Sequence, residues 1–439
     1  MSAILNSRLS IFPVSTSIGP DGGLSIAGHS LRHLASEYGT PLYLYDADTI
    51  LRQVTTLRQA LAEHYEGESV VAYAGKAYLS PGMAAKMAQL GTGLDVVSLG
   101  ELRIAKAAAF EAGGVHLHGN NKSKAELQAA LDWGIQAIVV DNLDELAFLE
   151  GLAEQSGKPA RIWLRITPDL EVETHPHLET SHPAIKFGLH IPNGQAAKAI
   201  QRARNSPWLK LTGLHMHLGS QLFATEPYLR AIEKLYSLAA EQEFIPEEFS
   251  PGGGWGVRYI PQDPDDAPTP WVKCVANAVT EESHRLGWQL PRLVLEPGRW
   301  LMARAGVAVY EVGAQKETSE GLHIVAVDGG MADNPRVAMY GARYTALVVD
   351  HPAEEANHLS QVVGKFCESG DVLIPEISLP AVSRGDLLAI PAAGAYQLSM
   401  SSNYNLASRP TVLWLESGKV EVMQAREYPE DIPWWVAKG

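Results

Sequence analysis

Cysteine is scarce in this chain, with only Cys274 and Cys367 among 439 residues. Two cysteines cannot form the disulfide framework of a small secreted protein, so we expect a reducing, cytoplasmic environment. The first residues contain a single arginine and no long apolar core, so we expect no signal peptide. No apolar run approaches the roughly 20 residues of a membrane-spanning helix, and we expect no membrane partner.

Basic residues are too few to balance the acidic ones, 35 against 50, which gives a net charge of −15. Such a surface repels nucleic acid and anionic membranes, so neither is expected as a partner. With 46% hydrophobic and 19% charged residues and no repeats, the composition is that of a globular protein. The length predicts either two cores or a barrel with a smaller companion domain.

A regular alternation begins near residue 68. Short runs rich in β-branched residues alternate with stretches of helical periodicity, such as PGMAAKMAQL and SKAELQAALDW. Eight strands, each followed by a helix, predict a closed (β/α)8 barrel. The predicted strands are 69–75, 93–98, 114–119, 136–141, 160–166, 211–219, 247–253 (the weakest) and 292–298.

The pattern changes after about residue 300, where apolar and polar residues alternate with a period of two, as in GLHIVAVDGG and TVLWLESGKVEVM. This alternation predicts antiparallel strands and few helices. The segment 1–36 also looks strand-like. We therefore predict an α/β protein with a TIM-like (β/α)8 barrel at 37–299, and a C-terminal antiparallel β-barrel or sandwich domain at 300–439 that also takes residues 1–36.

The active site of such a barrel lies at the carboxyl ends of its strands. Charged and polar groups, rather than ordinary turn residues, follow several of the predicted strands. This set of amine, imidazole, guanidinium, carboxylate and glycine suits an anionic aromatic cofactor. The residues at these ends are Lys76, Asp95, Arg165, His217, Ser220, Gly252, Gly253, Gly254, Glu296 and Arg299.

Lys76 ends the run YAGK. A lysine buried there is costly to keep charged, and its neutral amine is a nucleophile for aldehydes. Most strand-end lysines reach solvent instead, so the position alone leaves both interpretations open. The triple glycine 252–254 lets backbone N–H groups approach a phosphate closely, although the same run occurs in flexible turns. It is neither a P-loop nor a dinucleotide fingerprint.

His215 and His217 alternate on one predicted strand and therefore point to the same face. Because no carboxylate or cysteine lies at ligand spacing beside them, we expect core or stacking histidines and no metal site. The other histidines are interpreted as ordinary strand or loop residues, namely His116, His118, His175, His177 and His182.

Glu296 and Arg299 place opposite charges on one tight turn, LEPGR. They form either a surface pair of little energetic value or two separate ligands, one for a protonated ring nitrogen and one for an anion. Cys367 lies beside Glu368 and Asp371 in CESGD. A lone cysteine is usually a small buried hydrophobe, and the acidic neighbours make proton transfer the alternative.

Taken in order, these segments resemble the fold-type III pyridoxal-phosphate (PLP) decarboxylases, and among them the diaminopimelate decarboxylase family. The similarity extends over nearly the whole chain, and the number and order of the segments make it specific. The segments are LSIFP (9–13), YGTPLYLYD (38–46), YAGKAYLS, SLGEL (98–102), IKFG (185–188), HMHLGSQ, GGGWGVRY, EPGR, VDGGMADNPRVAMYG (327–341), CESGD (367–371) and GAYQLSMSSNYN (394–405).

The resemblance implies pyridoxal 5′-phosphate as the cofactor. It implies that Lys76 binds the cofactor aldehyde covalently and that His217 stacks on the ring. Glu296 would keep the ring nitrogen protonated, which makes the cofactor an electron sink. The whole cofactor-binding set implied in this way is Lys76, Asp95, Arg165, His217, Ser220, Gly252, Gly253, Gly254, Glu296, Gly298, Arg299 and Tyr396.

The resemblance also implies the reaction, which is decarboxylation of meso-2,6-diaminopimelate to L-lysine and CO2, the last step of lysine biosynthesis. Cys367 looks like the proton donor, supplied by the second subunit of a homodimer with shared active sites. The implied catalytic residues are Lys76 and Cys367. The implied substrate-binding residues are Arg299, Arg336, Tyr340, Glu368 and Tyr396.

Three other functions stay open. A sister decarboxylase of ornithine, lysine or a carboxy-polyamine would share the cofactor set but would not need paired arginines for a distal carboxylate. An alanine-racemase-like enzyme would share the architecture, although CESGD argues against it. A non-catalytic PLP-binding regulator would be expected to lose Lys76 or Cys367, and this chain has both.

Two segments depart from the family pattern. Ser250 and Pro251 precede the triple glycine where an acidic residue is expected, which leaves the support of the phosphate loop unexplained. The segment 175–184, HPHLETSHPA, also differs from the family. Neither departure removes a chemical group from the implied mechanism.

Overall fold

The structure is a computed structural model that describes residues 3–170, 185–428 and 430. The chain divides into two compact units. Residues 53–256 and 266–298 form one, called here the barrel unit, and residues 1–52, 257–265 and 299–439 form the other, called the sheet unit. Among the described residues, no helix has both the length and the apolar character needed to cross a membrane.

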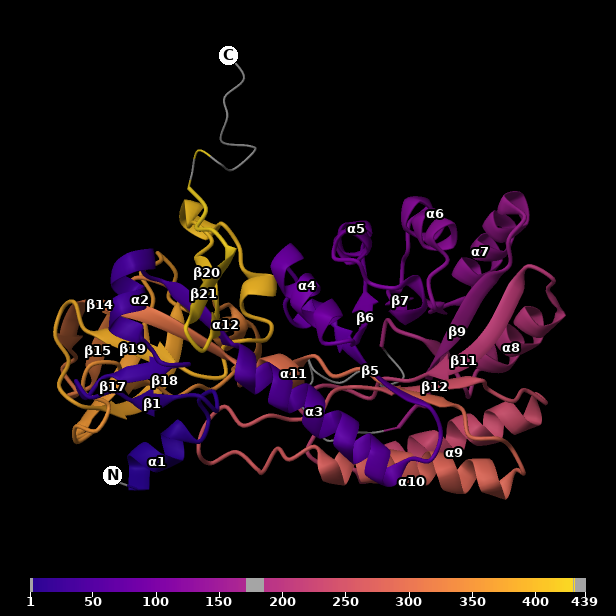
Figure 1. Cartoon of the computed structure of the whole chain (residues 1–439), viewed down its shortest axis with the longest axis horizontal. Helices are drawn as coiled ribbons and strands as arrows, with labels where there is room; N and C mark the ends of the chain where they lie inside the picture. The colour runs from indigo at the N-terminus through magenta and orange to yellow at the C-terminus, as the bar shows by residue number, and fades with distance from the viewer. Residues whose placement is uncertain (1–2, 171–184, 429, 431–439) are drawn as a thin grey trace, which may run out of the picture. The chain divides into compact units, whose positions relative to one another are not determined.

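Within the described part of the barrel unit, eight parallel strands close into a ring (Figure 1). β12 pairs with β11 and β13, β13 pairs with β5, and β8 pairs with β9, which confirms the predicted barrel and its weakest strand. The strands are β5 (Ser69–Ala74), β6 (Gly93–Val96), β7 (Val115–Leu117), β8 (Ala137–Val140), β9 (Ala160–Thr167), β11 (Leu209–His215), β12 (Glu248–Gly252) and β13 (Arg292–Leu295), with β10 (Leu189–His190) added to β9.

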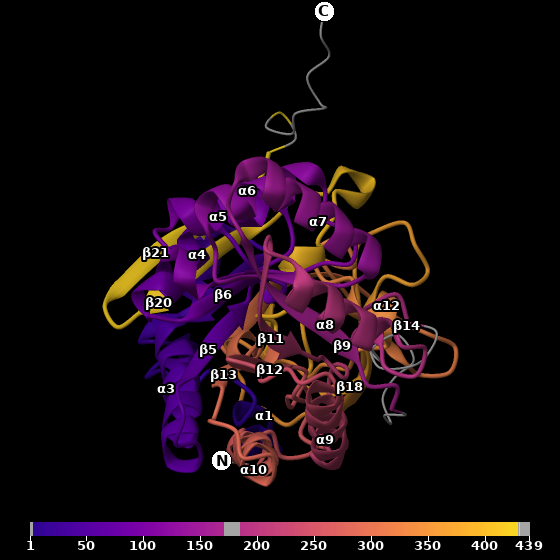
Figure 2. The same cartoon turned by 90° about the vertical axis from the view of Figure 1, so that its right-hand side faces the viewer.

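Helices lie outside the strands (Figure 2). Residues at the helix ends determine where the helices begin and end. Ser123 and Glu126 form a capping box at the start of α6. Gly134 ends that helix with a φ of 70°, which glycine adopts without steric cost. The helices are α3 (Ala47–His64), α4 (Pro81–Gln89), α5 (Leu99–Ala107), α6 (Lys124–Trp133), α7 (Leu143–Ser156), α8 (Gln195–Asn205), α9 (Glu226–Glu241) and α10 (Thr269–Arg285), with 3-10 turns η1 (Gly75–Ala77) and η2 (Ala112–Gly114).

The order of the helices differs from the prediction at one end. We expected every strand to be followed by a helix, and this is wrong for β13. The next helix, α11 (Arg299–Met302), has only four residues and belongs to the sheet unit. Helix α3, which comes before β5, lies alongside that strand in Figures 1 and 2, so the set of helices is shifted by one position along the chain.

A buried carboxylate explains how the weakest predicted strand is held. Glu248 begins β12 and is 4% exposed. Its carboxylate accepts hydrogen bonds from the indole N–H of Trp163 in β9 at 2.8 Å and from the hydroxyl of Thr212 in β11 at 3.1 Å. Arg161 and Arg292 approach it at 3.5 Å. These bonds from neighbouring strands anchor a segment whose own sequence favours a strand only weakly.

The main sheet of the sheet unit has the strand order β18-β17-β15-β14-β4-β20-β21, and β19 pairs with β14 and β16. Most strand pairs of this unit are antiparallel, as predicted for residues 300–439, but β15–β17 is parallel. The β4–β20 pair is also parallel, and β4 was not part of that prediction. Side chains alternate with period two in both kinds of pair, so the sequence pattern does not distinguish them. The elements are β4 (Leu42–Asp46), β14 (Gly306–Glu317), β15 (His323–Val327), α12 (Arg336–Tyr340), β16 (Leu347–Val348), β17 (His358–Val363), β18 (Val372–Leu379), β19 (Leu387–Ile390), η3 (Leu398–Met400), η4 (Tyr404–Leu406), β20 (Thr411–Glu416) and β21 (Lys419–Gln424).

The N-terminal segment is only partly extended. Its three short strands form a sheet of their own, and two helices flank them, so the prediction of a strand-like segment is wrong for the helical parts. These elements are α1 (Ala3–Leu9), β1 (Ser17–Ile18), β2 (Leu24–Ile26), β3 (His29–Ser30) and α2 (Leu31–Tyr38).

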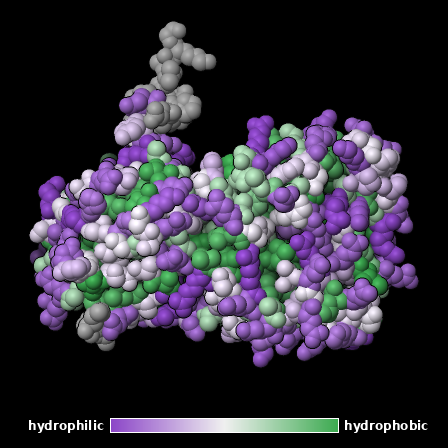
Figure 3. All heavy atoms as spheres, viewed as in Figure 1, coloured by the Kyte–Doolittle hydropathy of each residue, from purple (hydrophilic) through white to green (hydrophobic). Residues whose placement is uncertain are grey.

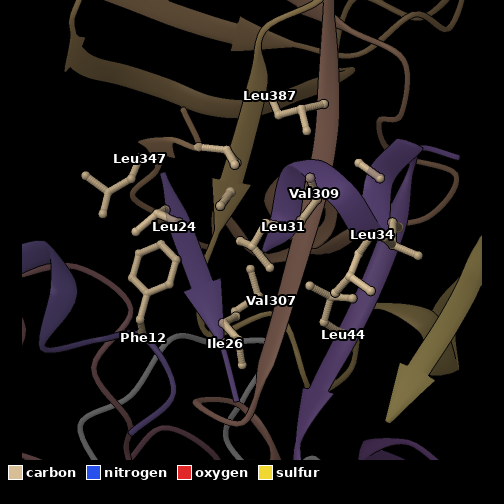
Figure 4. Close-up of a cluster of buried hydrophobic side chains, with 14 of the residues drawn as sticks. Phe12, Leu24, Ile26, Leu31, Leu34, Leu44, Val307, Val309, Leu347 and Leu387 are labelled. Atoms are coloured by element: carbon tan, nitrogen blue, oxygen red, sulfur yellow. The ribbon is translucent and has the colours of Figure 1, made fainter. Parts of the chain in front are cut away.

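Apolar packing explains why this segment folds with the main sheet. Figure 4 shows Phe12, Leu24 and Leu31 of the N-terminal segment in one cluster with Leu44 of β4 and Val307 of β14. Each is at most 1% exposed, and burying a side chain of this kind contributes about 1.5–3 kcal/mol. On the face shown in Figure 3, hydrophilic side chains cover most of the surface, with smaller apolar patches among these side chains.

Candidate active site

The carboxyl ends of the barrel strands bring two predicted cofactor residues, Asp95 and Glu296, together with His215 and Ser250, which were not in the predicted set. His215 ends β11, Asp95 lies in β6, Ser250 lies in β12, and Glu296 follows β13. All four are buried. Because the strands are parallel, these ends share one edge of the barrel, where enzymes of this architecture carry their active sites.

Glu296 is the central carboxylate of this edge. Its Oε2 lies 3.0 Å from His215 Nε2, and its Oε1 accepts a hydrogen bond from the Ser250 hydroxyl at 2.6 Å. Burial alone would raise the pKa of Glu296, but His215, His118 and these hydrogen bonds hold it well below its usual range. Burial lowers the pKa of His215 to about 4. The pair is therefore an ionised carboxylate and a neutral imidazole that donates its Nε2 proton.

Ser250 supplies the support that the sequence left unexplained before the glycine loop. Besides donating to Glu296, its hydroxyl oxygen accepts the backbone N–H of Gly252 at 3.1 Å. The serine is completely buried. It therefore ties the first glycine to the ionised carboxylate, at the position where an acidic residue was expected.

His116 and His118 also belong to this edge, so their interpretation as ordinary residues is wrong. His116 Nδ1 lies 3.0 Å from Asp95 Oδ1. His118 Nε2 lies 3.7 Å from the same oxygen and 3.9 Å from Glu296 Oε1, and its ring meets that of His215 edge to face at 5.0 Å. The sequence held a signal for this cluster, because the alternation in GVHLHG puts both histidines on one face of the strand beside β6.

Three of these residues are close enough to hold a metal ion. One ligand atom each from His118, His215 and Glu296 lie within 4.8 Å of one another. No carboxylate lies at ligand spacing from His215 in the sequence, but Glu296 reaches it from a strand far along the chain. Both Glu296 oxygens already accept hydrogen bonds, so a metal would have to displace one of them. An ionised carboxylate in this setting also suits a protonated ring nitrogen.

The triple glycine forms a cradle that has no room for side chains. A Cβ atom on Gly253 would lie 2.2 Å from the Glu296 carbonyl oxygen, and one on Gly254 would lie 2.1 Å from the Gly219 carbonyl oxygen. Gly252 and Gly254 have φ values of 73° and 98°, which other residues rarely adopt. A loop of this kind brings backbone N–H groups close to an anion such as a phosphate.

His217 links the glycine loop to the basic groups of the edge. Its Nδ1 accepts the Gly253 N–H at 3.3 Å. Burial first, and then the charges of Lys76 and Arg165, lower the pKa of His217 well below its ordinary value. The ring is therefore neutral and suited to stacking on an aromatic group. Ser220, three residues further along, is half-buried.

Lys76 follows β5 in the turn η1, and its side chain is exposed. Burial therefore does not make this amine reactive, and the side chain reaches solvent, which is the alternative that the sequence left open. Its charge nevertheless acts on His217, which places the amine near the stacking imidazole. Gly298 lets the turn after β13 pass close to β5, because a Cβ atom there would lie 3.1 Å from that of Ala74.

A buried network of four charges, which the sequence analysis missed except for Arg165, lies at the same edge. Lys122 Nζ donates to the carbonyl oxygens of Gly119 at 2.7 Å and Val139 at 2.6 Å, and to Glu145 Oε1 at 2.8 Å.

Arg165 completes the network through its neighbours. Its guanidinium lies 4.0 Å from Asp141 and 4.5 Å from the centre of the Phe187 ring. Burial raises the pKa of Asp141, and the charges of Arg165 and Lys122 oppose that rise. The network therefore holds a buried guanidinium beside His217.

The predicted substrate arginines lie in the sheet unit. Arg299 and Arg336 are 6% and 5% exposed. Tyr259 contacts both, since its hydroxyl accepts a hydrogen bond from Arg299 Nη1 at 2.7 Å and its ring centre lies 4.7 Å from Arg336 Cζ. Arg336 Nη1 also donates to the Tyr344 hydroxyl at 2.5 Å, and the Tyr396 ring lies 4.6 Å from Arg299 Cζ. Neither Tyr259 nor Tyr344 was predicted from the sequence.

Cys367 and Glu368 are exposed on the loop between β17 and β18 of the sheet unit. The Cys367 N–H donates to Asn405 Oδ1 at 3.2 Å, and the Tyr404 hydroxyl donates to the Cys367 carbonyl oxygen at 3.4 Å. An exposed thiol excludes the interpretation of Cys367 as a small buried hydrophobe. Tyr340 ends α12 and is half-buried.

Part of the predicted set lies outside the described residues. His175, His177 and His182 belong to the segment 171–184, as does the whole of the departure HPHLETSHPA. The remaining predicted residues fall into two groups. The cofactor residues from Lys76 to Gly298 lie in the barrel unit, and those from Arg299 onward lie in the sheet unit.

Comparisons with known proteins agree with this chemistry. Residues 47–303 match the family model described as "Pyridoxal-dependent decarboxylase, pyridoxal binding domain". Diaminopimelate decarboxylase from Bacillus subtilis (strain 168) is 42% identical over 415 residues, which are 94% of this chain and 94% of that protein.

Solved structures show the same relationship. Diaminopimelate decarboxylase from M. jannaschii in complex with L-lysine has 33% sequence identity and a TM-score of 0.88, and the match covers 95% of this chain and 96% of that one. A lysine/ornithine decarboxylase from Vibrio vulnificus, complexed with putrescine, has a TM-score of 0.72 over 88% of this chain and 98% of that one, but its 24% identity shows the fold alone. The chain therefore belongs to the pyridoxal-dependent decarboxylases, and within them to the diaminopimelate decarboxylase family.

Proposed function

We propose that this chain catalyses the PLP-dependent decarboxylation of meso-2,6-diaminopimelate to L-lysine and CO2, the last step of lysine biosynthesis. The observation that carries the proposal is an ionised Glu296, held by His215 and Ser250, directly beside a glycine cradle for a phosphate. The relatives named diaminopimelate decarboxylase, which match nearly the whole chain, support the choice of substrate.

The barrel residues fit PLP in their chemistry. Ionised Glu296 suits a protonated ring nitrogen, neutral His217 suits the face of the ring, and the glycine loop suits the phosphate. Asp95 Oδ2 and His118 Nε2 are buried polar atoms without a hydrogen-bond partner among the described residues, as expected beside a polar ligand. When bound, PLP supplies a conjugated ring that accepts the electrons released as the carboxylate leaves.

The protein's own groups bind and orient the cofactor. Lys76 would hold the cofactor through its amine, and the negative charge of Glu296 would favour a protonated ring nitrogen. His215 and Ser250 keep Glu296 ionised and fixed by hydrogen bonds. Arg165 adds a buried positive charge beside His217 and stays in place through Asp141 and Phe187. Asp95, Ser220, Gly298, Arg299 and Tyr396 complete the proposed set.

The sheet-unit residues bind the substrate in this proposal. Arg299 and Arg336 offer planar N–H donors to the distal carboxylate, and Glu368 accepts the distal ammonium. Tyr340 and Tyr396 complete the substrate set, and the Cys367 thiol donates a proton to the carbon that loses its carboxylate. An exposed thiol is suited to this role because it is accessible to a substrate.

Turnover of a panel of amino acids tests the proposal. Purified protein with PLP is incubated with meso-diaminopimelate, lysine or ornithine, and CO2 release is measured. A site built to hydrogen-bond a distal carboxylate rejects analogues without it by roughly 10⁴-fold, so lysine and ornithine should remain near background. Comparable turnover of lysine and meso-diaminopimelate would refute the assignment and favour the sister decarboxylase.

Covalent cofactor binding is tested separately. The wild-type protein should show a visible absorbance band with PLP and a borohydride-fixed adduct at Lys76. Lys76→Ala should lose the adduct and keep the circular dichroism spectrum of the wild type. A wild-type protein that never takes up PLP would refute the whole proposal.

We extend the proposal to a homodimer in which one copy supplies Cys367 and Glu368 to the Lys76 site of the other. The exposure of both residues on one loop supports it. Lys76→Ala and Cys367→Ala homodimers should each be nearly inactive, and mixed dimers should recover part of the activity because one of their sites has both residues. Verified mixed dimers without recovery would show that each chain completes its own site.

The domain boundaries stay a prediction, with the PLP-binding domain at 37–299 and the β domain at 1–36 and 300–439. A cytoplasmic location is also part of the proposal, and the two free thiols of Cys274 and Cys367 support it. A small amino acid as substrate, with neither nucleic acid nor membrane as partner, agrees with the net charge of −15.

A further inference from the structure

The loop that carries Cys367 is closed by a buried aspartate that the mechanism does not use. Asp371 is 3% exposed, although the four residues before it are exposed. Its Oδ2 accepts the backbone N–H of Phe366 at 2.8 Å, immediately before the cysteine. Its own backbone N–H donates to the Glu368 carbonyl oxygen at 3.1 Å, and its carbonyl oxygen accepts the Gly364 N–H at 2.9 Å. One residue therefore holds both ends of the loop.

The same carboxylate also holds a second segment. Its Oδ1 accepts the backbone N–H of Met331 at 2.6 Å. A further bond joins the two segments, from the Lys365 N–H to the Gly329 carbonyl oxygen at 3.1 Å. Asp371 thus spans two stretches of chain that are separated by β16 and β17 in the sequence.

Two glycines make room for this carboxylate. A Cβ atom on Gly330 would lie 2.4 Å from an oxygen of Asp371, and one on Gly364 would lie 2.2 Å from the other. Distances this short require the carboxylate to move. Both segments are therefore shaped to receive Asp371, one on each side.

The second segment leads directly to Arg336. The Gly330 N–H donates to Asp333 Oδ1 at 2.9 Å, which closes a turn, and α12 begins at Arg336 three residues later. The Asp333 carboxylate also accepts the Tyr310 hydroxyl at 2.5 Å. The cysteine loop and the arginine helix are thus joined through Asp371 and the turn at Gly330.

We propose that Asp371 is a positioning residue that holds the Cys367 thiol and the Glu368 carboxylate in place by fixing their loop to the turn that precedes α12. The inference rests on the proposed function, because it takes Cys367 as the proton donor and Glu368 as a substrate ligand. Asp371 itself touches neither substrate nor cofactor. It acts through the backbone N–H groups of Phe366 and Met331.

The Asp371→Asn variant tests the proposal. Its side-chain amide replaces one carboxylate oxygen by an NH2 group, which cannot accept the backbone N–H of Phe366 or Met331. A displacement of the proton donor by about 1 Å costs on the order of 10²-fold in rate, so kcat should fall at least about ten-fold while KM changes by less than about three-fold. The solvent deuterium isotope effect on kcat should rise as proton delivery becomes slower. A residue with a purely structural role would lower the amount of folded protein and leave this isotope effect unchanged.

Asp386→Asn is the matched control. Asp386 also accepts a loop N–H through its carboxylate, from Ser383 at 2.6 Å in the same unit, but its turn carries no proposed active-site residue. This variant should keep the wild-type kcat and isotope effect.

Alkylation of Cys367 separates failure of this proposal from failure of the proposed function. The rate of carbamidomethylation by iodoacetamide, resolved by peptide mapping, should change at least about five-fold in Asp371→Asn and stay the same in Asp386→Asn. The alkylation rate is measured without substrate and does not depend on which substrate the enzyme uses. A folded Asp371→Asn protein with alkylation rate and kcat within about two-fold of wild type would overturn the positioning role.

A second variant and a measurement on the wild type cover the case in which Asp371→Asn does not fold. Gly364→Ala keeps the aspartate and pushes its carboxylate away, so it should change alkylation and kcat in the same direction. In the wild type, hydrogen exchange should show protected amides at Met331 and Phe366, although both lie in loops. Rapid exchange at both amides would contradict the proposal.

Discussion

Removal of the Lys122 ammonium gives a sharp test of the buried charge network. The side chains of Lys122 and Glu145 are 1% and 5% exposed, and their charged atoms lie 2.8 Å apart. In Lys122→Met the Glu145 carboxylate stays buried without its cation, and Asp141 adds a like charge nearby. Breaking a buried pair in this way costs about 3–5 kcal/mol.

Protonation of Glu145 limits how much unfolding free energy the Lys122→Met variant can lose through electrostatics. At pH 7, protonating a glutamate with an ordinary pKa of about 4.3 costs roughly 3.7 kcal/mol. If an unpaired, buried Glu145 carboxylate costs more than this, Glu145 takes up a proton instead. At pH 5.5 the same step costs only about 1.6 kcal/mol. Since burial raises the pKa of Glu145 in the folded protein, the variant's deficit should be largest at neutral pH and shrink as the pH falls.

Urea unfolding followed by circular dichroism measures the deficit at both pH values. Arg202→Met is the control, because the Arg202–Glu150 pair has a similar distance of 2.7 Å but is 45% and 23% exposed. Its loss should stay below about 1 kcal/mol. The double variant Lys122→Met/Glu145→Gln, which has no buried charge at this pair, should recover much of the loss. A Lys122→Met protein within about 1 kcal/mol of wild type at pH 7, or a deficit equal at both pH values, would refute the reasoning.

Three further predictions concern the site. Ser250→Ala removes the hydroxyl that donates to Glu296 and accepts from the glycine loop, so the PLP dissociation constant should rise about ten-fold in a fluorescence titration, and an unchanged constant would contradict the role. Gly253→Ala places a Cβ atom 2.2 Å from a carbonyl oxygen and should abolish the PLP absorbance band, whereas Gly151→Ala, with nothing within 4 Å, should keep it. Arg336→Ala should lower kcat/KM for meso-diaminopimelate by an amount equivalent to about 3–5 kcal/mol, and a loss below about 1 kcal/mol would show that the guanidinium does not bind the substrate.

The barrel was predicted well because a short stretch of sequence is enough to identify each of its strands. Runs such as SVVAYAG and QAIVVD are short, apolar and β-branched, and glycine or serine marks where the helices begin and end. The run EEFSPGG is weak by the same measure, and its strand depends on a carboxylate, Glu248, whose partners come from other strands. The two parallel pairs of the sheet unit were not predictable, because the period-two pattern is the same in parallel and antiparallel pairs and β4 meets β20 from a distant part of the chain.

The site was predictable only in part. Strand ends marked Asp95 and Glu296, since the architecture puts such ends together. The hydrogen-bond partners of these residues could not be predicted in the same way. His215 and Glu296, for example, lie 81 positions apart, and no spacing rule joins them. Ser250 was noted as a departure, and its contact with the Glu296 carboxylate appears only when β12 and β13 lie side by side.

The position of β4 has a consequence for the order in which the protein is made. Leu42–Asp46 emerges early during synthesis, yet its neighbours in the sheet are residues 306–309 and 411–415. At roughly 5–20 residues per second, the ribosome needs on the order of tens of seconds to make the first of these partners. Until then a strand whose five residues are all buried in the finished protein has both edges open. A ribosome-bound fragment that ends near residue 300 should therefore bind chaperones more strongly than one that ends after β20.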